Sequence, residues 1–249
     1  MARVTRTLRV AAILAAVLLW PAPASAANNF HAPVALDGKV FPVLNSAEGR
    51  WLNWRDTYGA LRMRQQPDGV WKQTGTHQGI DIFTERGAPI VAITSGTIER
   101  SGWTFYSGWR IGVRGNDNRY YFYAHLLQEF APGIAEGAVV TAGQLLGRVG
   151  SSGYGPVGTA DEFPPHLHLG IQAGTRWVNP EPLLRQLFLH STTSIRNHRG
   201  RVAAIDFQIR ALGARAHLPA APAAADLAAR IAALVNQRRE LLRQTTLAI

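Results

Sequence analysis

The sequence contains no cysteine among its 249 residues. This absence excludes a disulfide scaffold, a zinc finger, a thiol enzyme and a lipid anchor attached through a lipobox cysteine. A chain of this length can bury a core for one substantial domain or two small ones without covalent cross-links. The sequence therefore predicts a fold that rests on packing alone.

Charged residues are also scarce. They make up 17% of the chain, against 47% for apolar residues, which is typical of a globular protein and not of a disordered one. Lys39 and Lys72 are the only lysines among the 26 basic residues, and the formal net charge is +10. A basic excess favours acidic partners, which at this point include nucleic acid, a membrane surface and an anionic polymer such as the cell wall.

Long apolar runs are missing as well. The longest unbroken run, Val10–Trp20, has 11 residues, well short of the roughly 20 that span a bilayer. It follows the arginines at positions 3, 6 and 9 and precedes Ala24-Ser25-Ala26, the small-x-small pattern of a signal-peptidase site. We therefore predict a signal peptide over residues 1–26, with an uncleaved anchor as the alternative, and no integral membrane span after cleavage.

Export limits the acidic partners that the positive net charge can indicate. Removal of residues 1–26 takes away three arginines and no acidic residue, and lowers the net charge from +10 to +7. An exported protein, periplasmic or extracellular, does not normally meet chromosomal DNA. Nucleic acid is therefore not an expected partner, whereas anionic peptidoglycan is.

Turn signals divide residues 41–184 into short strand-like segments. Glycine-rich turns recur at intervals of roughly eight to twelve residues, with no helical period between them. In the clearest case, segments 110–113 and 119–123 are joined by Gly115-Asn116-Asp117-Asn118, a hairpin-type turn. The pattern predicts a mostly β protein, with an N-terminal arm over residues 27–40 and an antiparallel β-sandwich or barrel-like domain over residues 41–184.

Residues 185–249 form a C-terminal extension of different character. Its first part, to about residue 222, has mixed composition, whereas an amphipathic helix is predicted over about 223–245. Its apolar face consists of Leu227, Ile231, Leu234, Val235, Leu241 and Leu242, with arginines around it. We expect this helix to pack on its own domain or on a partner subunit; contact with a membrane or a wall polymer is the alternative.

Three short motifs place histidines at spacings that suit a metal site. In His77-Gln78-Gly79-Ile80-Asp81, residues 77, 79 and 81 would share one face of a strand, and Gly79 would leave open space for an ion. In His166-Leu167-His168, the two imidazoles would share a face of a strand, whereas on a helix they would diverge by about 200°. Tyr123-Ala124-His125 adds an imidazole at the end of an aromatic strand.

These residue types match the ligand set of a catalytic zinc site. Two histidines and an aspartate would leave the fourth position to water, and zinc would polarise a scissile carbonyl and lower the pKa of that water. The remaining imidazoles would supply a proton shuttle and a donor for the developing oxyanion. Chance pairing on half-buried strands is the alternative, and it explains any single motif more easily than all of them together. The other four histidines, at 31, 190, 198 and 217, have no ligand spacing.

The same motifs resemble the signature of peptidase family M23, the cell-wall endopeptidases of the LytM and lysostaphin type. The resemblance covers roughly residues 41–184 and is highly specific. It implies an antiparallel β fold of the duplicated hybrid motif type, with a groove. It also implies one zinc ion per chain, held by His77, Asp81 and His168, with His125 and His166 as catalytic residues that do not bind the metal.

The function that this resemblance implies is hydrolysis of peptide bonds in peptidoglycan stems or cross-bridges. Which of His125 and His166 is the general base stays open, as does the bond that is cleaved. One alternative is a catalytically inactive M23-like scaffold that activates a cell-wall amidase, and another is a plain basic wall-binding protein. All five site positions keep their expected residue types, which favours the enzyme.

Three features depart from the pattern or imitate another one. Residues 158–165 form a longer, acidic and proline-containing loop, which we expect to line one wall of the groove and to influence substrate choice. Gly170 stands where the family often has an acidic residue. Residues 153–158 match GxGxxG, but no helix start follows, so the nucleotide-binding interpretation fails.

Overall fold

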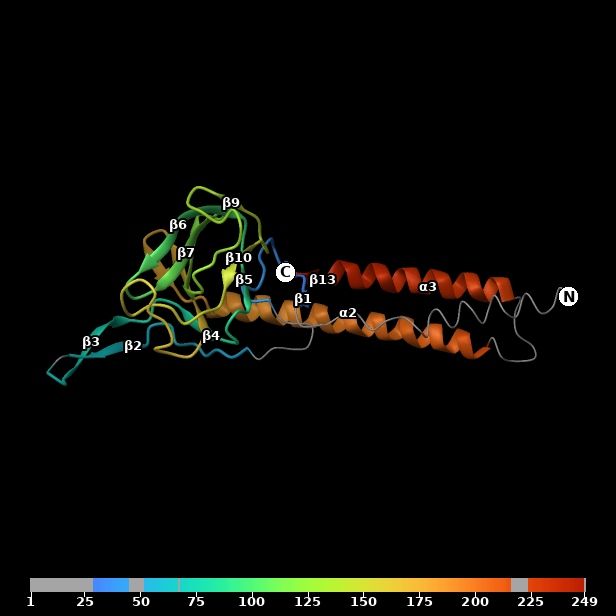
Figure 1. Ribbon diagram of the computed structural model, residues 1–249, viewed down its shortest axis with the longest axis horizontal. Coiled ribbons are helices and arrows are strands. Elements are labelled where there is room, and N and C mark those ends of the chain that lie inside the picture. Colours follow the sequence, from blue (N-terminus) through green and yellow to red (C-terminus); the bar gives the residue numbers. More distant parts are fainter. Residues whose placement is uncertain (1–28, 45–51, 67, 216–223, 249) are drawn as a thin grey trace. The chain divides into compact units, whose positions relative to one another are not determined.

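The computed structural model describes residues 29–44, 52–66, 68–215 and 224–248 (Figure 1). The predicted signal peptide and His217 lie outside these residues. The chain divides into two compact units. The first is Pro33–Thr192, and the second combines residues up to Ala32 with Thr193–Ile249. Packing alone does not define functional boundaries, so the proposed domain limits at residues 41 and 184 stay a prediction.

A seven-stranded antiparallel sheet forms the centre of the first unit. Its strand order is β12-β11-β8-β7-β6-β9, and β4 also pairs with β11. The strands are β4 (Ile80–Phe83), β6 (Gly96–Thr104), β7 (Gly108–Gly115), β8 (Arg119–Leu126), β9 (Val139–Val140), β11 (His166–Ala173) and β12 (Arg176–Val178). The predicted hairpin is confirmed as β7 and β8.

Two smaller strand pairs complete the first unit. Strands β5 (Pro89–Val91) and β10 (Leu145–Arg148) pair with each other, and β2 (Leu61–Gln65) and β3 (Trp71–Thr76) form an exposed hairpin. In the part of the chain that the structure describes, no pairing joins β9 to β12, so the main sheet does not close. The predicted fold class, antiparallel β with a helical tail, is confirmed without a closed barrel.

Alternate burial along the strands positions the site. In β4, Ile80 and Ile82 are fully buried in the core while Asp81 between them is partly exposed. In β11, Leu167 and Leu169 enter the same core, so His166 and His168 take the opposite face of the strand. The core also contains Ile90 of β5 and Leu146 of β10 and is therefore shared by both sheets.

Helix α2 (Glu181–Arg215) has 35 residues and is not predicted by the sequence pattern. It begins after Asn179, whose Oδ1 accepts a hydrogen bond from the Glu181 amide at 2.9 Å. Asn179 therefore caps the helix, and Pro180 suits the first helical position. Leu184 and Leu187 bury the start of α2 in the core of the first unit.

Helix α3 (Ala224–Thr245) lies in the second unit, where the sequence pattern predicts a helix. Its Leu227 and Ile231 pack with Leu212 of α2 in a separate apolar cluster. The Arg238 Nε donates to Asp206 Oδ1 at 2.6 Å. Contact of α3 with a partner subunit stays a prediction.

Strands β1 (Asn29–His31) and β13 (Thr246–Ala248) also belong to the second unit and pair antiparallel. Among the described residues, neither helix combines the length and apolar character needed to cross a bilayer.

Candidate metal centre and active-site cleft

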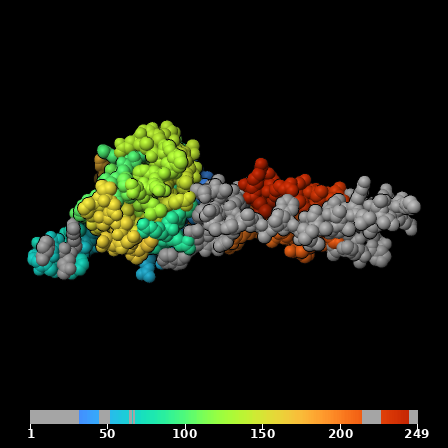
Figure 2. Space-filling view, viewed as in Figure 1, coloured from blue at the N-terminus to red at the C-terminus, as the bar shows by residue number. Residues whose placement is uncertain are grey.

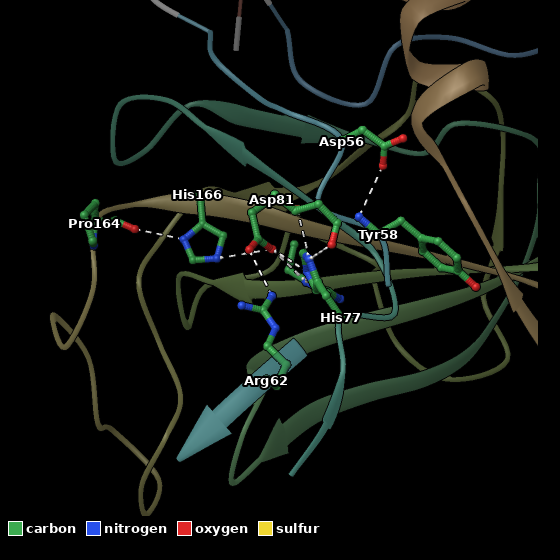
Figure 3. A network of polar contacts seen from close by, with 9 residues as sticks. Asp56, Tyr58, Arg62, His77, Asp81, Pro164 and His166 are labelled. Carbon is green, nitrogen blue, oxygen red and sulfur yellow. Dashed lines mark hydrogen bonds and ion pairs between the residues drawn. The ribbon is translucent and has the colours of Figure 1, made fainter. Parts of the chain in front are cut away.

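Three side chains converge at the junction of β4 and β11. Asp81 and His168 lie opposite each other in the strand register, and His77 stands in the segment before β4. The Asp81 Oδ1 lies 3.1 Å from His77 Nε2 and 2.9 Å from His168 Nδ1. The two nitrogens are 3.0 Å apart. Figure 3 shows His77 and Asp81 pointing toward each other.

The route by which His77 and Asp81 meet differs from the prediction. Strand β3 ends at Thr76 and β4 begins at Ile80, so His77 is not on a strand and strand alternation does not place it. Gly79 leaves no open space either. A Cβ there would lie 2.7 Å from the His168 Nε2 and 2.5 Å from the Leu169 carbonyl oxygen. Glycine is needed because His168 packs directly against the backbone at this position.

The converging atoms suit a divalent metal ion. The His77 Nδ1 lies 3.1 Å from the Thr57 carbonyl oxygen and 3.0 Å from the Thr57 hydroxyl oxygen. Since the carbonyl only accepts, a proton on Nδ1 satisfies this contact and leaves the lone pair of Nε2 facing Asp81 and His168. His77 is only 2% exposed. Two imidazole nitrogens and one carboxylate oxygen, all within 4.8 Å of one another, form a donor set that zinc accepts. Because these atoms carry lone pairs or negative charge, a cation between them would stabilise the arrangement.

The carboxylate of Asp81 is held in its charged form. Burial by itself raises the pKa of Asp81, but hydrogen bonds with His168 and His77 outweigh it and hold the pKa well below the usual range. The second oxygen, Oδ2, accepts a hydrogen bond from Arg62 Nη2 of strand β2 at 3.2 Å (Figure 3). Asp81 therefore presents Oδ1 to the two histidines and Oδ2 to Arg62.

Two further imidazoles flank the three ligand candidates. His125, at the end of β8 with a φ of 63°, donates from Nδ1 to the Ser152 carbonyl oxygen at 2.7 Å. His166 donates from Nδ1 to the Pro164 carbonyl oxygen at 2.9 Å. Since a carbonyl oxygen only accepts, the neutral form of each ring keeps a free lone pair on Nε2. The two ring centroids are 4.8 Å apart.

Burial keeps both flanking imidazoles neutral. It lowers the pKa of His125 to about 3, with a further contribution from the nearby His166 and His168. Burial also lowers the pKa of His166, although the negative charge of Asp81 opposes the shift. The His166 Nε2 lies 3.7 Å from Asp81 Oδ1, so an uncharged proton acceptor stands beside the candidate metal position.

All five residues line one cleft of about 790 Å³. Its walls are rich in aromatic side chains, namely Phe83, Tyr106, Phe122, Tyr154, Phe163 and Trp177. The Phe163 ring lies 4.7 Å from the His125 ring and 5.1 Å from the His166 ring, measured between centroids. Glu162, Phe163 and Pro164 belong to the loop predicted to line the groove, and they do so. Much of residues 154–165, between β10 and β11, is exposed on the surface of the first unit (Figure 2), and Val157 is 69% exposed.

Comparison with known proteins places this cleft in a family. Residues 75–180, which contain all five site residues, match the model of peptidase family M23. The chain is 49% identical over 113 residues to the L-Ala–D-Glu endopeptidase of Bacillus subtilis, a match that covers 44% of this chain and 34% of that protein. It is 32% identical to the crystallised catalytic domain of lysostaphin from Staphylococcus simulans, covering 53% of this chain and 92% of that domain, with a TM-score of 0.41.

Residues 75–180 form a domain of peptidase family M23. A glycyl-glycine endopeptidase of Staphylococcus capitis is also similar, at 34% identity over 158 residues, which cover 60% of this chain and 40% of that protein. The chain thus spans less than half the length of the Bacillus protein and of this staphylococcal protein. The family resemblance predicted from the histidine motifs is confirmed.

In this M23 domain, an indole ring lies beside the position where the family often has an acidic side chain. A Cβ on Gly170 would lie 2.6 Å from Trp177 Cζ3 and 3.0 Å from the Gln78 carbonyl oxygen. Any larger side chain at Gly170 would therefore have to displace Trp177, whose ring lines the cleft.

Several contributors to the M23 site are missing from the sequence prediction. Ser152 and Pro164 act through backbone carbonyls, which any residue type supplies, so no sequence signal marks them. Thr57 contacts His77 through both its carbonyl and its hydroxyl oxygen and lies in no motif. Arg62 belongs to a hairpin that the sequence analysis does not predict. The Pro67-Asp68-Gly69 turn signal in the sequence could have revealed that hairpin.

Proposed function

We propose that this chain is a zinc-dependent endopeptidase that hydrolyses peptide bonds in bacterial peptidoglycan. The convergence of His77, Asp81 and His168 beside two neutral imidazoles carries the proposal. The names of the relatives, an L-Ala–D-Glu endopeptidase, lysostaphin and a glycyl-glycine endopeptidase, support a peptide substrate from the cell wall. The volume of the aromatic cleft, about 790 Å³, is within the range typical of ligand sites.

The zinc ligands in this proposal are His77 Nε2, Asp81 Oδ1 and His168 Nδ1. The Thr57 carbonyl fixes the tautomer of His77, and Arg62 holds the second oxygen of Asp81. A zinc ion bound there would polarise the scissile carbonyl and lower the pKa of a water molecule toward neutrality. Two neutral ligands and one anionic ligand leave a net positive charge at the site, which favours a substrate oxygen that becomes negative.

His125 and His166 act as the proton acceptor and donor of the reaction. Each holds its Nδ1 proton in a hydrogen bond to a carbonyl oxygen, so Nε2 is the atom that accepts or returns a proton. Once protonated at Nε2, either ring becomes a donor toward the oxyanion of the tetrahedral state. The order in which the two rings act is not assigned.

The test combines metal analysis with product release from purified peptidoglycan. We expect about one zinc ion per chain in the wild type and in the His125→Ala and His166→Ala variants, and loss of zinc in His77→Ala, Asp81→Ala and His168→Ala. Soluble fragments should appear only with the wild type and disappear with a chelator. Removal of a general base or oxyanion donor is expected to lower turnover by at least roughly a hundredfold.

The outcomes separate the alternatives. Stoichiometric zinc without any release of fragments would favour the inactive scaffold that activates an amidase. Binding to peptidoglycan that survives chelation, with no bond cut, would favour a basic wall-binding protein. Mass spectrometry of the soluble products identifies the peptide bond that is cleaved, because hydrolysis creates new termini at that bond.

We also propose that the mature protein is exported to the periplasm or the medium after cleavage behind Ala26, with the peptidase domain over residues 41–184. The leader pattern and the net charge of +7 after its removal support this. N-terminal sequencing of the protein purified from its native host tests the cleavage site. An intact Met1 on the exported protein would contradict it.

A further inference from the structure

A second cavity of about 520 Å³ shares two walls with the active-site cleft. Strand β8 presents His125 to the cleft and Leu126 to the second cavity. The segment before β11 contributes Phe163 to the cleft and Ser152 to the second cavity. A volume of this size is within the range of roughly 300–1,000 Å³ that is typical of small-molecule sites. Of the residues that line it, only Ser152 has a role in the M23 site proposed above, through the carbonyl oxygen that holds His125.

An aromatic platform forms one side of this cavity. Trp103 of β6 and Trp109 of β7 face each other in the strand register, with ring centroids 5.6 Å apart and an interplanar angle of 77°. Phe130 adds a third ring, 6.0 Å from Trp109 and edge-on to it. All three side chains are partly exposed, so ring surface is accessible from the cavity.

Unused polar groups surround the platform. Within the described residues, the indole N–H groups of Trp103 and Trp109 have no protein acceptor, although buried indoles usually find one. The side chains of Gln128 and Glu129 are exposed and likewise make no hydrogen bond or ion pair among the residues described. Arg148 donates one hydrogen bond, from Nη1 to the Gly87 carbonyl oxygen at 3.1 Å, and its other guanidinium N–H groups make no hydrogen bond within the described residues.

This combination matches a saccharide better than a peptide or an anion. A pyranose ring offers a flat face of C–H groups that packs on an aromatic ring, and hydroxyl or acetamido groups at its rim that both donate and accept hydrogen bonds. The aromatic rings of the cavity suit the C–H face of the sugar, and its polar side chains suit the hydroxyl and acetamido groups. Glu129 and Arg148 bring opposite charges, and the third charged residue of the lining, Arg86, is paired with Asp161, so the cavity does not select a charged ligand.

We propose that this cavity binds a sugar unit of the glycan strand to which the substrate peptide is attached. The inference rests on the proposed function, because peptidoglycan joins a glycan and a peptide in one molecule. The shared walls would let one peptidoglycan fragment place its peptide in the cleft and its sugar on the tryptophan platform. The cavity then selects peptides that are still attached to glycan.

The test measures binding of a soluble oligosaccharide that contains no peptide bond. The N-acetylglucosamine tetramer is titrated into the full-length protein by calorimetry. We expect saturable binding that Trp103→Ala weakens by about tenfold or more, as for an aromatic side chain at the centre of a contact. Trp71→Ala is the matched control, because Trp71 is 60% exposed on β3 and does not line the cavity. That control should bind like the wild type.

A second cavity variant, less disruptive to the fold, separates loss of binding from misfolding. Gln128→Ala removes an exposed side chain and should also weaken binding, by a smaller factor than Trp103→Ala. Absence of saturable binding to the wild type would overturn the inference, as would unchanged binding in both cavity variants.

A second assay, hydrolysis of purified peptidoglycan by the same preparation, distinguishes failure of the sugar site from failure of the proposed function. Tetramer binding without any hydrolysis of peptidoglycan would contradict only the proposed function. Hydrolysis without tetramer binding would contradict only the sugar site.

Discussion

At the scale of single residues, backbone carbonyls decide what the histidines can do. The Ser152 and Pro164 carbonyl oxygens each hold the Nδ1 proton of one flanking imidazole, and Thr57 does the same for His77. In each case Nε2 is left to face the cleft. The residue types at the site could be read from the sequence, but the tautomers could not, because they depend on backbone carbonyls, which any residue type supplies.

The lowered pKa of His125 predicts acid sensitivity of the metal-free protein. The folded state keeps this imidazole neutral down to a pH of about 3, whereas an unfolded chain protonates it near 6.5. Between these values the unfolded state binds the extra proton, so the free energy of unfolding falls as pH falls. One such group contributes a slope of up to about 1.4 kcal/mol per pH unit.

His125→Asn isolates this contribution. Asparagine tolerates a positive φ and can still donate to the Ser152 carbonyl, but it does not titrate. We expect urea midpoints, measured with a chelator at pH 7 and pH 4.5, to move less in this variant than in the wild type. His190→Asn on α2, outside the cleft, should behave like the wild type. Equal pH shifts in wild type and His125→Asn would contradict the prediction.

At the scale of elements, the spacing of apolar residues identifies strand β11, which carries two of the site histidines. It does not identify elements whose sequence is polar or irregular. The alternation in His166-Leu167-His168-Leu169 correctly predicts a strand with both imidazoles on one face. By contrast, the middle of α2 contains a polar stretch with threonines at 192 and 193 and a glycine at 200, residues of low helix propensity, so no apolar period stands out. Tertiary burial at Leu184 and Leu187 and the Asn179 cap stabilise the helix instead.

An ion pair in the loop over residues 158–165 is predicted to position His166 without contacting it. Asp161, with a φ of 68°, pairs with Arg86 and accepts a hydrogen bond from Ser151 Oγ at 2.6 Å. These contacts anchor the loop that ends at Pro164, whose carbonyl holds His166. For Asp161→Ala we expect unchanged zinc content and turnover lowered about tenfold, the equivalent of one hydrogen bond and one exposed ion pair.

Two variants control this experiment. Val157→Ala alters an exposed side chain of the same segment and should leave turnover unchanged. The charge exchange Arg86→Asp with Asp161→Arg should restore part of the activity that each single change removes. Loss of zinc in Asp161→Ala would show that the loop supports the metal ligands and not His166.

At the scale of the whole molecule, the described residues include two separate apolar clusters. One lies under the sheets of the first unit and extends to Leu187, and the other joins Leu212, Leu227 and Ile231 in the second unit. All five site residues and every tryptophan that the structure describes belong to Pro33–Thr192. Tryptophan fluorescence therefore reports unfolding of the first unit, and stabilisation by the metal should be local to it.

Zinc is expected to stabilise the first unit and to leave α3 unchanged. A ligand that binds only the folded state adds about 2.7 kcal/mol at a hundredfold excess over its dissociation constant. The metal should therefore raise the urea midpoint seen by tryptophan fluorescence and slow hydrogen exchange in β4 and β11, which carry Asp81 and His168. Exchange in α3 should not change, since its apolar cluster contains no residue of the site.

His168→Ala is the control for this effect, because it removes one ligand from a position that is partly open to solvent. This variant should unfold at the same urea concentration with and without zinc. If zinc stabilised it as much as the wild type, the ion would be bound elsewhere, and the assignment of His77, Asp81 and His168 as ligands would fail. If α3 were protected together with β4, the two units would unfold as one, and the separate clusters would not act as independent cores.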